Sequence, residues 1–178
     1  MADRLTSNDF PQPCVVVGVS PHVPDTVVSA AARLASDLHA GLVAVWVDAG
    51  RLPVLEGIDG AMMSIPLDPD GEDEEPPSFD NDLRKRILDL CRPQGIEPIC
   101  HTMVGETAQA LCKVAKVADA QLIVVGSRRP GVKAGIAEFF NGSIAVALIH
   151  RQHRPVVVVP VAPVGKDEPM PWDTALSV

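Results

Sequence analysis

The sequence has 178 residues, which is enough for one well-formed hydrophobic core and too few for two domains of ordinary size. Its formal net charge is -8, but six acidic residues between Asp68 and Glu75 leave a net charge of about -2 elsewhere. With no basic stripe and only six aromatic residues to stack on bases, the composition argues against a nucleic-acid-binding protein.

The sequence also predicts the compartment. The N-terminus has no basic segment followed by an apolar run, and no apolar run is long enough to cross a bilayer, so we expect no membrane association. The four cysteines show no CxxC spacing and lie in apolar stretches, as buried thiols do in a reducing environment. We therefore expect a cytoplasmic protein.

Apolar, β-branched runs alternate with amphipathic segments along the chain. The runs lack polar alternation, which is typical of strands buried on both faces, and predict strands over residues 14–19, 42–48, 96–104, 121–125 and 156–159. Apolar residues at helical spacing predict helices over about 27–38, 83–91, 107–118 and 142–151. This order predicts an α/β fold: an open, Rossmann-like five-stranded parallel sheet with helices on both faces.

We assign a single domain to residues 14–161, and three segments fall outside the alternating pattern. Residues 1–13 form an N-terminal extension and residues 162–178 a C-terminal tail. Residues 49–77 are acidic and rich in Pro and Gly, which predicts a mobile loop. The alternative is a charged segment that docks a partner.

The segment from Gly126 to Ser143 is the best candidate for a functional site. It leaves a predicted strand and enters a predicted helix, where unpaired N–H groups and the Ser143 hydroxyl favour an anion. Its charged residues are Arg128, Arg129 and Lys133 against Glu138. Because this loop is basic in an acidic chain, phosphate is the expected guest. The alternative is that Gly126 and Gly142 only shape a strand exit and a helix start.

Other polar groups give no catalytic or metal site. His150 and His153 have the spacing of a metal pair but lack a third ligand. Cys100 and His101 lie inside a predicted strand and are expected in the core. Glu138 is the one general base near the loop, so we predict a protein that is not an enzyme and assign no catalytic or metal-binding residue.

Several motifs between residues 14 and 161 resemble the universal stress protein family. They are VVVGVS, IVVGSR and NGSIAVALIHRQHRPVVVVP. The resemblance implies an adenine nucleotide alpha hydrolase-like fold and an adenine nucleotide, ATP with Mg as counter-ion, as ligand. It assigns the phosphates to Gly126, Arg128, Gly142, Ser143 and Ile144. It assigns the base end of the ligand to the strand ends at Gly18, Ser20, Trp46 and Val47.

The sequence departs from the family pattern in three ways. Arg129 stands at the second glycine position, and Gly126 precedes Gly142 by sixteen positions instead of thirteen. Ser20 replaces an aspartate, and Trp46 stands at or beside the adenine position. These departures keep a second interpretation open, a dimeric interaction module with a degenerate nucleotide site. In either case the resemblance implies a stress-response protein that forms a homodimer through the Val156–Val161 strand.

Overall fold

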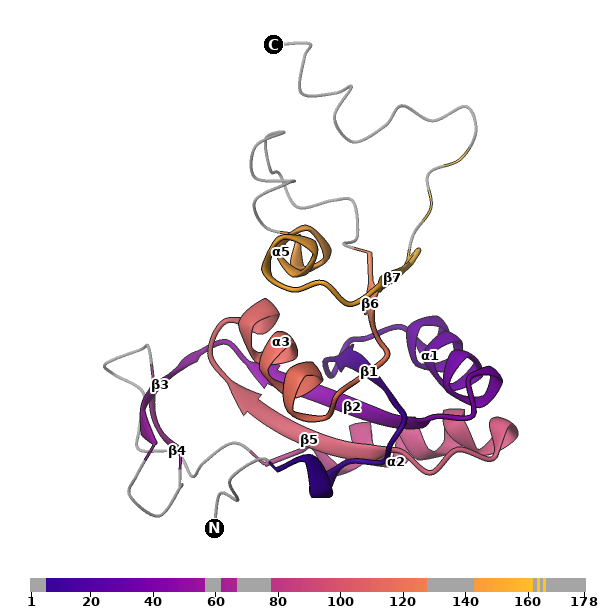
Figure 1. Ribbon diagram of the computed structural model, residues 1–178, viewed down its shortest axis with the longest axis horizontal. Helices are drawn as coiled ribbons and strands as arrows, with labels where there is room; N and C mark the ends of the chain where they lie inside the picture. The colour runs from indigo at the N-terminus through magenta and orange to yellow at the C-terminus, as the bar shows by residue number, and fades with distance from the viewer. Residues whose placement is uncertain are drawn as a thin grey trace.

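A parallel β-sheet forms the centre of the molecule (Figure 1). The computed structural model describes residues 6–56, 62–66, 78–127, 143–161, 163 and 165. Within them, five strands pair in the order β5-β2-β1-β6-β7, all in parallel. The strands are β1 (Cys14–Val19), β2 (Gly41–Asp48), β5 (Ile99–Val104), β6 (Leu122–Gly126) and β7 (Val156–Val159). The predicted sheet is confirmed.

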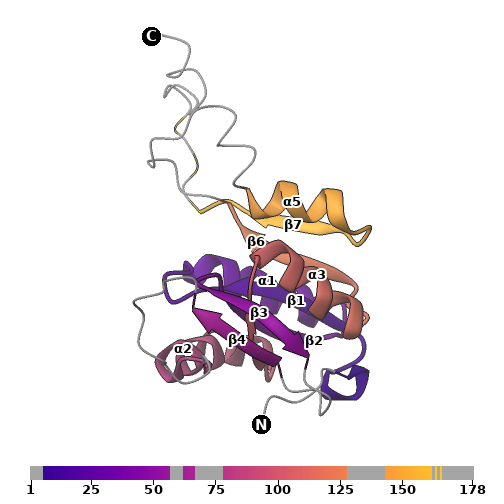
Figure 2. The same ribbon diagram turned by 90° about the vertical axis from the view of Figure 1, so that its left-hand side faces the viewer.

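Helices cover both faces of this sheet (Figure 2). They are α1 (Asp25–Asp37), α2 (Asn81–Cys91), α3 (Thr107–Val117) and α5 (Ile144–Arg151), with short 3-10 turns at Ser7–Asp9 and Arg92–Gln94. Helices α1 and α2 pack on one face, and α3 and α5 pack on the other. Side chains of Asp80, Glu106 and Ser143 cap the starts of α2, α3 and α5.

The core has two halves, one on each side of the sheet. Along β1, Val15 and Val17 belong to the half under α1 and α2, whereas Cys14 and Val16 belong to the half under α3. All four are fully buried. Successive strand residues point to opposite faces, so a strand covered on both faces must be apolar throughout. This explains the uninterrupted apolar run that predicts β1.

The segment between β2 and α2, for which the sequence predicts a mobile loop, contains a β-hairpin. Strands β3 (Arg51–Glu56) and β4 (Met62–Pro66) form a separate two-stranded antiparallel sheet. Arg51 Nε donates a hydrogen bond to Ser64 Oγ at 3.0 Å across it. The two strands were not predicted because the acidic run dominates the composition of residues 49–77 and hides two short apolar runs. That acidic run, residues 68–75, lies outside the described residues.

The N-terminal extension contributes to the core. Phe10 is only 6% exposed and joins the core half under α3, and its ring meets His101 of β5 edge-on at 6.1 Å. The hydrophobic core therefore includes Phe10, which lies four residues before residue 14, the start of the domain assigned from the sequence. The reason is that Phe10 stands alone, so it gives no periodic signal.

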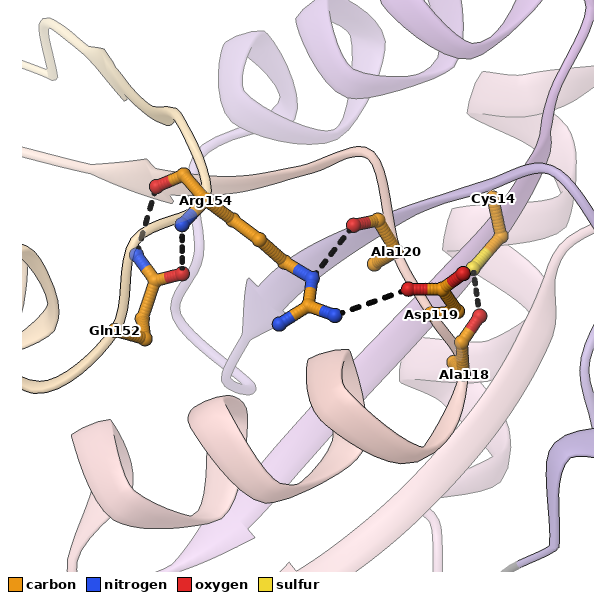
Figure 3. A network of polar contacts seen from close by, with 6 residues as sticks. All are labelled: Cys14, Ala118, Asp119, Ala120, Gln152 and Arg154. Carbon is orange, nitrogen blue, oxygen red and sulfur yellow. Dashed lines mark hydrogen bonds and ion pairs between the residues drawn. The ribbon is translucent and has the colours of Figure 1, made fainter.

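Arg154 joins the last strand of the sheet to the turn before its neighbour β6 (Figure 3). Its Nε donates to Ala120 O at 2.7 Å and its Nη2 to Asp119 Oδ1 at 3.1 Å, which ties the start of β7 to the turn before β6. Next to this turn, the Cys14 thiol donates to Ala118 O at 3.4 Å. These contacts lie at the amino ends of the strands and leave the opposite edge of the sheet open for a site. No helix in the described part of the chain is long and apolar enough to span a membrane.

Candidate functional site

A pocket of about 350 Å³ lies at the carboxyl ends of β1, β2 and β6. Open parallel sheets bind ligands at this edge, beside the point where the strand order reverses. Here β1 is that point, since the chain runs outward from it to β2 on one side and to β6 on the other. The lining residues are Gly18, Val19, Ser20, His22, Val23, Pro24, Val45, Val47, Thr107, Leu111, Val125, Gly126, Ser127, Ile144 and Val161.

Two glycines shape the pocket by leaving room for their neighbours. A Cβ at Gly18 would lie 3.1 Å from Leu111 Cδ1. A Cβ at Gly126 would lie 3.0 Å from Val161 Cγ2 and 3.1 Å from Val27 Cγ2. These distances are shorter than the usual contact of about 3.5–4.0 Å between carbon atoms, so any larger residue would displace a wall.

The connection between β1 and α1 forms one wall. Ser20, His22, Val23 and Pro24 all line the pocket, and Val23 N–H donates to Ser20 O at 2.9 Å, which closes a turn. Ser20 and His22 are exposed, so their polar atoms are available to a ligand. His22 is the one titratable side chain among the described lining residues.

Ser127 joins the exit of β6 to the segment that follows β7. Its N–H donates to Val159 O at 2.8 Å, and its hydroxyl oxygen accepts from Val161 N–H at 2.9 Å. The pair of bonds brings Val161 against Gly126, and Val161 becomes part of the pocket wall. From the sequence, Val161 is expected only in the Val156–Val161 strand, with no part in the site.

Of the segment predicted to bind the phosphates, the structure describes only the two ends, at Gly126 and at Ser143. Gly126 and Ile144 line the pocket, and Ser143 stands next to Ile144 as the cap of α5, its Oγ accepting from Val146 N–H at 3.4 Å. Arg128 and Gly142 lie outside the described residues, as do Arg129, Lys133 and Glu138. The two ends meet at one pocket although sixteen positions separate Gly126 from Gly142.

The base end of the predicted site includes Gly18, Ser20 and Val47 but not Trp46. Val45 and Val47 of β2 line the pocket, and Trp46 points to the opposite face of the sheet, where its ring meets Phe79 edge-on at 6.5 Å. The two-residue period of a strand gives the reason, because neighbouring residues cannot face the same side. Trp46 thus packs in the core half under α1 and α2.

Comparison with known proteins addresses the same part of the chain. The family model described as "Universal stress protein family" matches residues 14–160. The chain belongs to the universal stress protein family. No curated protein matches the sequence significantly.

Solved universal stress proteins have a similar fold. One from Archaeoglobus fulgidus has 20% identity and a TM-score of 0.56, and the match covers 83% of this chain and 98% of the other. One described as in complex with cAMP has 20% identity and a TM-score of 0.57, with 85% and 99% covered. A third, from Archaeoglobus fulgidus and described as in complex with dAMP, has 19% identity and a TM-score of 0.50, with 83% and 97% covered.

The thiols and the half-buried His101 of this universal stress protein lie outside the pocket. Burial raises the pKa of Cys100 and lowers the pKa of His101, so both side chains favour their neutral forms. Neither lines the pocket. Among the residues that the structure describes, no three His, Cys, Asp or Glu side chains gather as metal ligands would.

Sequence reasoning missed three parts of the pocket wall. These are His22 to Pro24 after β1, Thr107 and Leu111 of α3, and Val161 after β7. A signal for the first was available, because the connection between the first strand and helix of such sheets lies at the ligand-binding edge. Thr107 and Leu111 share one face of α3, but only the packing of that helix beside β1 shows which face meets the pocket.

Proposed function

We propose that this universal stress protein binds an adenine nucleotide, ATP with Mg as counter-ion, in the pocket at the carboxyl ends of β1, β2 and β6. The observation that carries the proposal is the pocket itself, which has Gly18 and Gly126 in its wall where a Cβ would press on neighbouring side chains. Its volume of about 350 Å³ falls within the usual range for small-molecule sites. The cAMP and dAMP named for two solved relatives support the choice of an adenine nucleotide.

The proposal orients the nucleotide by charge. The base lies toward Ser20 and Val47, and the phosphates lie toward the loop that begins at Gly126 and ends at the start of α5. That loop carries Arg128, Gly142 and Ser143 in the sequence, and helix starts favour anions. The described lining residues include no carboxylate that would repel a phosphate.

The proposed role is that of a cytoplasmic stress-response regulator and not of an enzyme. Support comes from the described pocket wall, which is made mostly of glycine and aliphatic residues and offers His22 as its one titratable group. Such a wall suits binding and release of a nucleotide better than acid–base chemistry.

A thermal-shift titration tests nucleotide binding. At a ligand concentration about 100-fold above Kd, ATP with Mg should stabilise the protein by about 2.7 kcal/mol, which raises the Tm of a chain of this size by about 5–10 °C. The double variant R128M/S143A should lose this shift. Because Ser143 also caps α5, the shift is measured from the variant's own ligand-free Tm, with R92M as the matched control. No shift of the parent protein at millimolar ATP would refute the proposal.

The edge strand supports a second function, that of a dimeric interaction module. Strand β7 ends the sheet, Val158 on it is 45% exposed, and Ile149 of the adjacent α5 is 58% exposed. An exposed apolar edge strand favours pairing with another chain, and a second copy related by a two-fold axis gives closed pairing.

Sedimentation equilibrium tests the dimer. The parent protein should have the mass of two chains, V158K should have the mass of one, and L88K, a lysine at an exposed apolar site on α2, should remain a dimer. A parent protein that is monomeric at micromolar concentration would exclude the dimer. A dimer without any ATP-dependent shift would favour the module over the nucleotide binder.

A further inference from the structure

Arg86 of α2 bonds to the connection that forms one wall of the pocket. Its Nε donates to Asp25 Oδ1 at 2.6 Å, its Nη2 to Val23 O at 2.7 Å, and its Nη1 to Pro21 O at 3.4 Å. The Arg86 and Asp25 side chains also form an ion pair. One guanidinium thus holds three groups spread over five consecutive residues, between the end of β1 and the first turn of α1.

The connection has few other restraints on its backbone. Pro21 and Pro24 have no N–H to donate. Residues 20–24 are all described, and one backbone hydrogen bond joins two of them, from Val23 N–H to Ser20 O. Arg86 therefore supplies contacts that the backbone of this wall does not make for itself.

Arg86 is itself well placed to act as an anchor. Asp80 Oδ1 caps α2 by accepting from Leu83 N–H at 2.6 Å. Leu83, Ile87 and Cys91 bury the inner face of this helix in the same core half as Val23. The guanidinium thus extends from a fixed helix to a connection with little internal bonding.

The three contacts also satisfy acceptor groups along this connection. The carbonyl oxygens of Pro21 and Val23 accept from Arg86, and the charge of Asp25 is balanced by it. Val23 lines the pocket, and Pro21 and Asp25 stand next to lining residues, so these contacts restrain the wall from three points.

We propose that Arg86 is a positioning residue for the pocket, holding Pro21, Val23 and Asp25 so that Ser20, His22 and Pro24 form a fixed wall for the ligand. This inference rests on the proposed nucleotide function for its ligand and on the described contacts for its mechanism. Holding a wall in its bound shape before the ligand arrives lowers the cost of ordering it on binding.

The test compares R86M with R92M. Arg92 follows the same helix, is paired with Asp89 at 3.0 Å and is exposed, so R92M removes a charge and an ion pair without touching the pocket. R86M should weaken ATP binding about tenfold in a calorimetric titration, and R92M should not. R86K should give an intermediate affinity, because one ammonium group cannot reach all three acceptors in fixed geometry.

Hydrogen exchange of the Val23 amide separates positioning from general stability. R86M should speed exchange at Val23 by about tenfold while the amides of β1 and β6 keep their parent rates. Three results would overturn the proposal: unchanged ATP affinity, unchanged exchange at Val23, or faster exchange throughout the sheet. If the parent protein binds no ATP, the proposed function fails separately, and faster exchange at Val23 in R86M alone still supports the positioning role.

Discussion

Replacing Gly126 by alanine tests the packing that shapes the pocket. The new Cβ would lie 3.0 Å from Val161 Cγ2 and 3.1 Å from Val27 Cγ2. Val27 is fully buried in α1 and β-branched, so it cannot turn away, whereas Val161 is half-buried and can shift. Overpacking of this kind costs about 1–3 kcal/mol, and because one of the two neighbours can move, we expect about 1–2 kcal/mol. For a chain of this size this lowers Tm by about 2–8 °C.

Urea unfolding of four proteins measures this cost. The set is the parent, G126A, V161A and the double variant G126A/V161A. Removing the Val161 methyl groups relieves one of the two contacts. The loss in free energy of unfolding in the double variant should therefore be about 0.5–1 kcal/mol smaller than the sum of the losses in the two single variants. G50A is the control, because its Cβ would meet only the Asp48 carboxylate, at 3.2 Å, at an exposed turn. A G126A protein as stable as the parent, or strict additivity with V161A, would refute the reasoning.

Three further predictions concern groups outside the pocket. R154M should lower the free energy of unfolding by about 1–3 kcal/mol in urea titration, because a buried carbonyl loses its partner; R92M should not. Burial raises the pKa of Cys14 and of Cys91 to about 11, so few of these thiols are ionised at pH 8. Ellman's reagent should therefore label the partly exposed Cys112 well before Cys14 and Cys91. Equal labelling rates for the three thiols would contradict this prediction. Burial lowers the pKa of His101 below its usual 6.5, so the unfolded chain binds more protons at this residue than the folded chain does. The free energy of unfolding should therefore fall as the pH drops below about 6.5. In thermal melts from pH 5 to 7, H101Q should show a weaker dependence of stability on pH.

Most of the sheet could be predicted because burial on both faces leaves a strong pattern. The run Val156–Val159 has its predicted bounds, and the other strand and helix ends lie within three residues of those expected. The hairpin was missed for an identifiable reason. Pro53 interrupts the first run, a residue that weakens a strand assignment, and the structure accommodates it next to a register shift between Pro53 and Leu55. A two-stranded ribbon with no central strand tolerates such a residue.

The site could be predicted at the level of strands and not of side chains. Gly18, Ser20, Val47, Gly126 and Ile144 line one pocket, because the carboxyl ends of parallel strands share one edge, and their role in binding stays a prediction. The placement of the Trp46 side chain depends on which face of β2 meets the pocket, and the two-residue period alone leaves that choice open. Leu111 and Val161 are positioned by helix packing and by the hydrogen bonds of Ser127, contacts that have no sequence signature.

The position of Val161 in the pocket wall has a consequence for how the protein is made. Strand β1 leaves the ribosome before its neighbour β6, which follows about a hundred residues later, and Val161 comes after β7. The pocket therefore cannot close until Val161 has emerged, long after β1. A ligand that requires this pocket can stabilise the finished protein but not its nascent intermediates, so the early strands must remain soluble without its help.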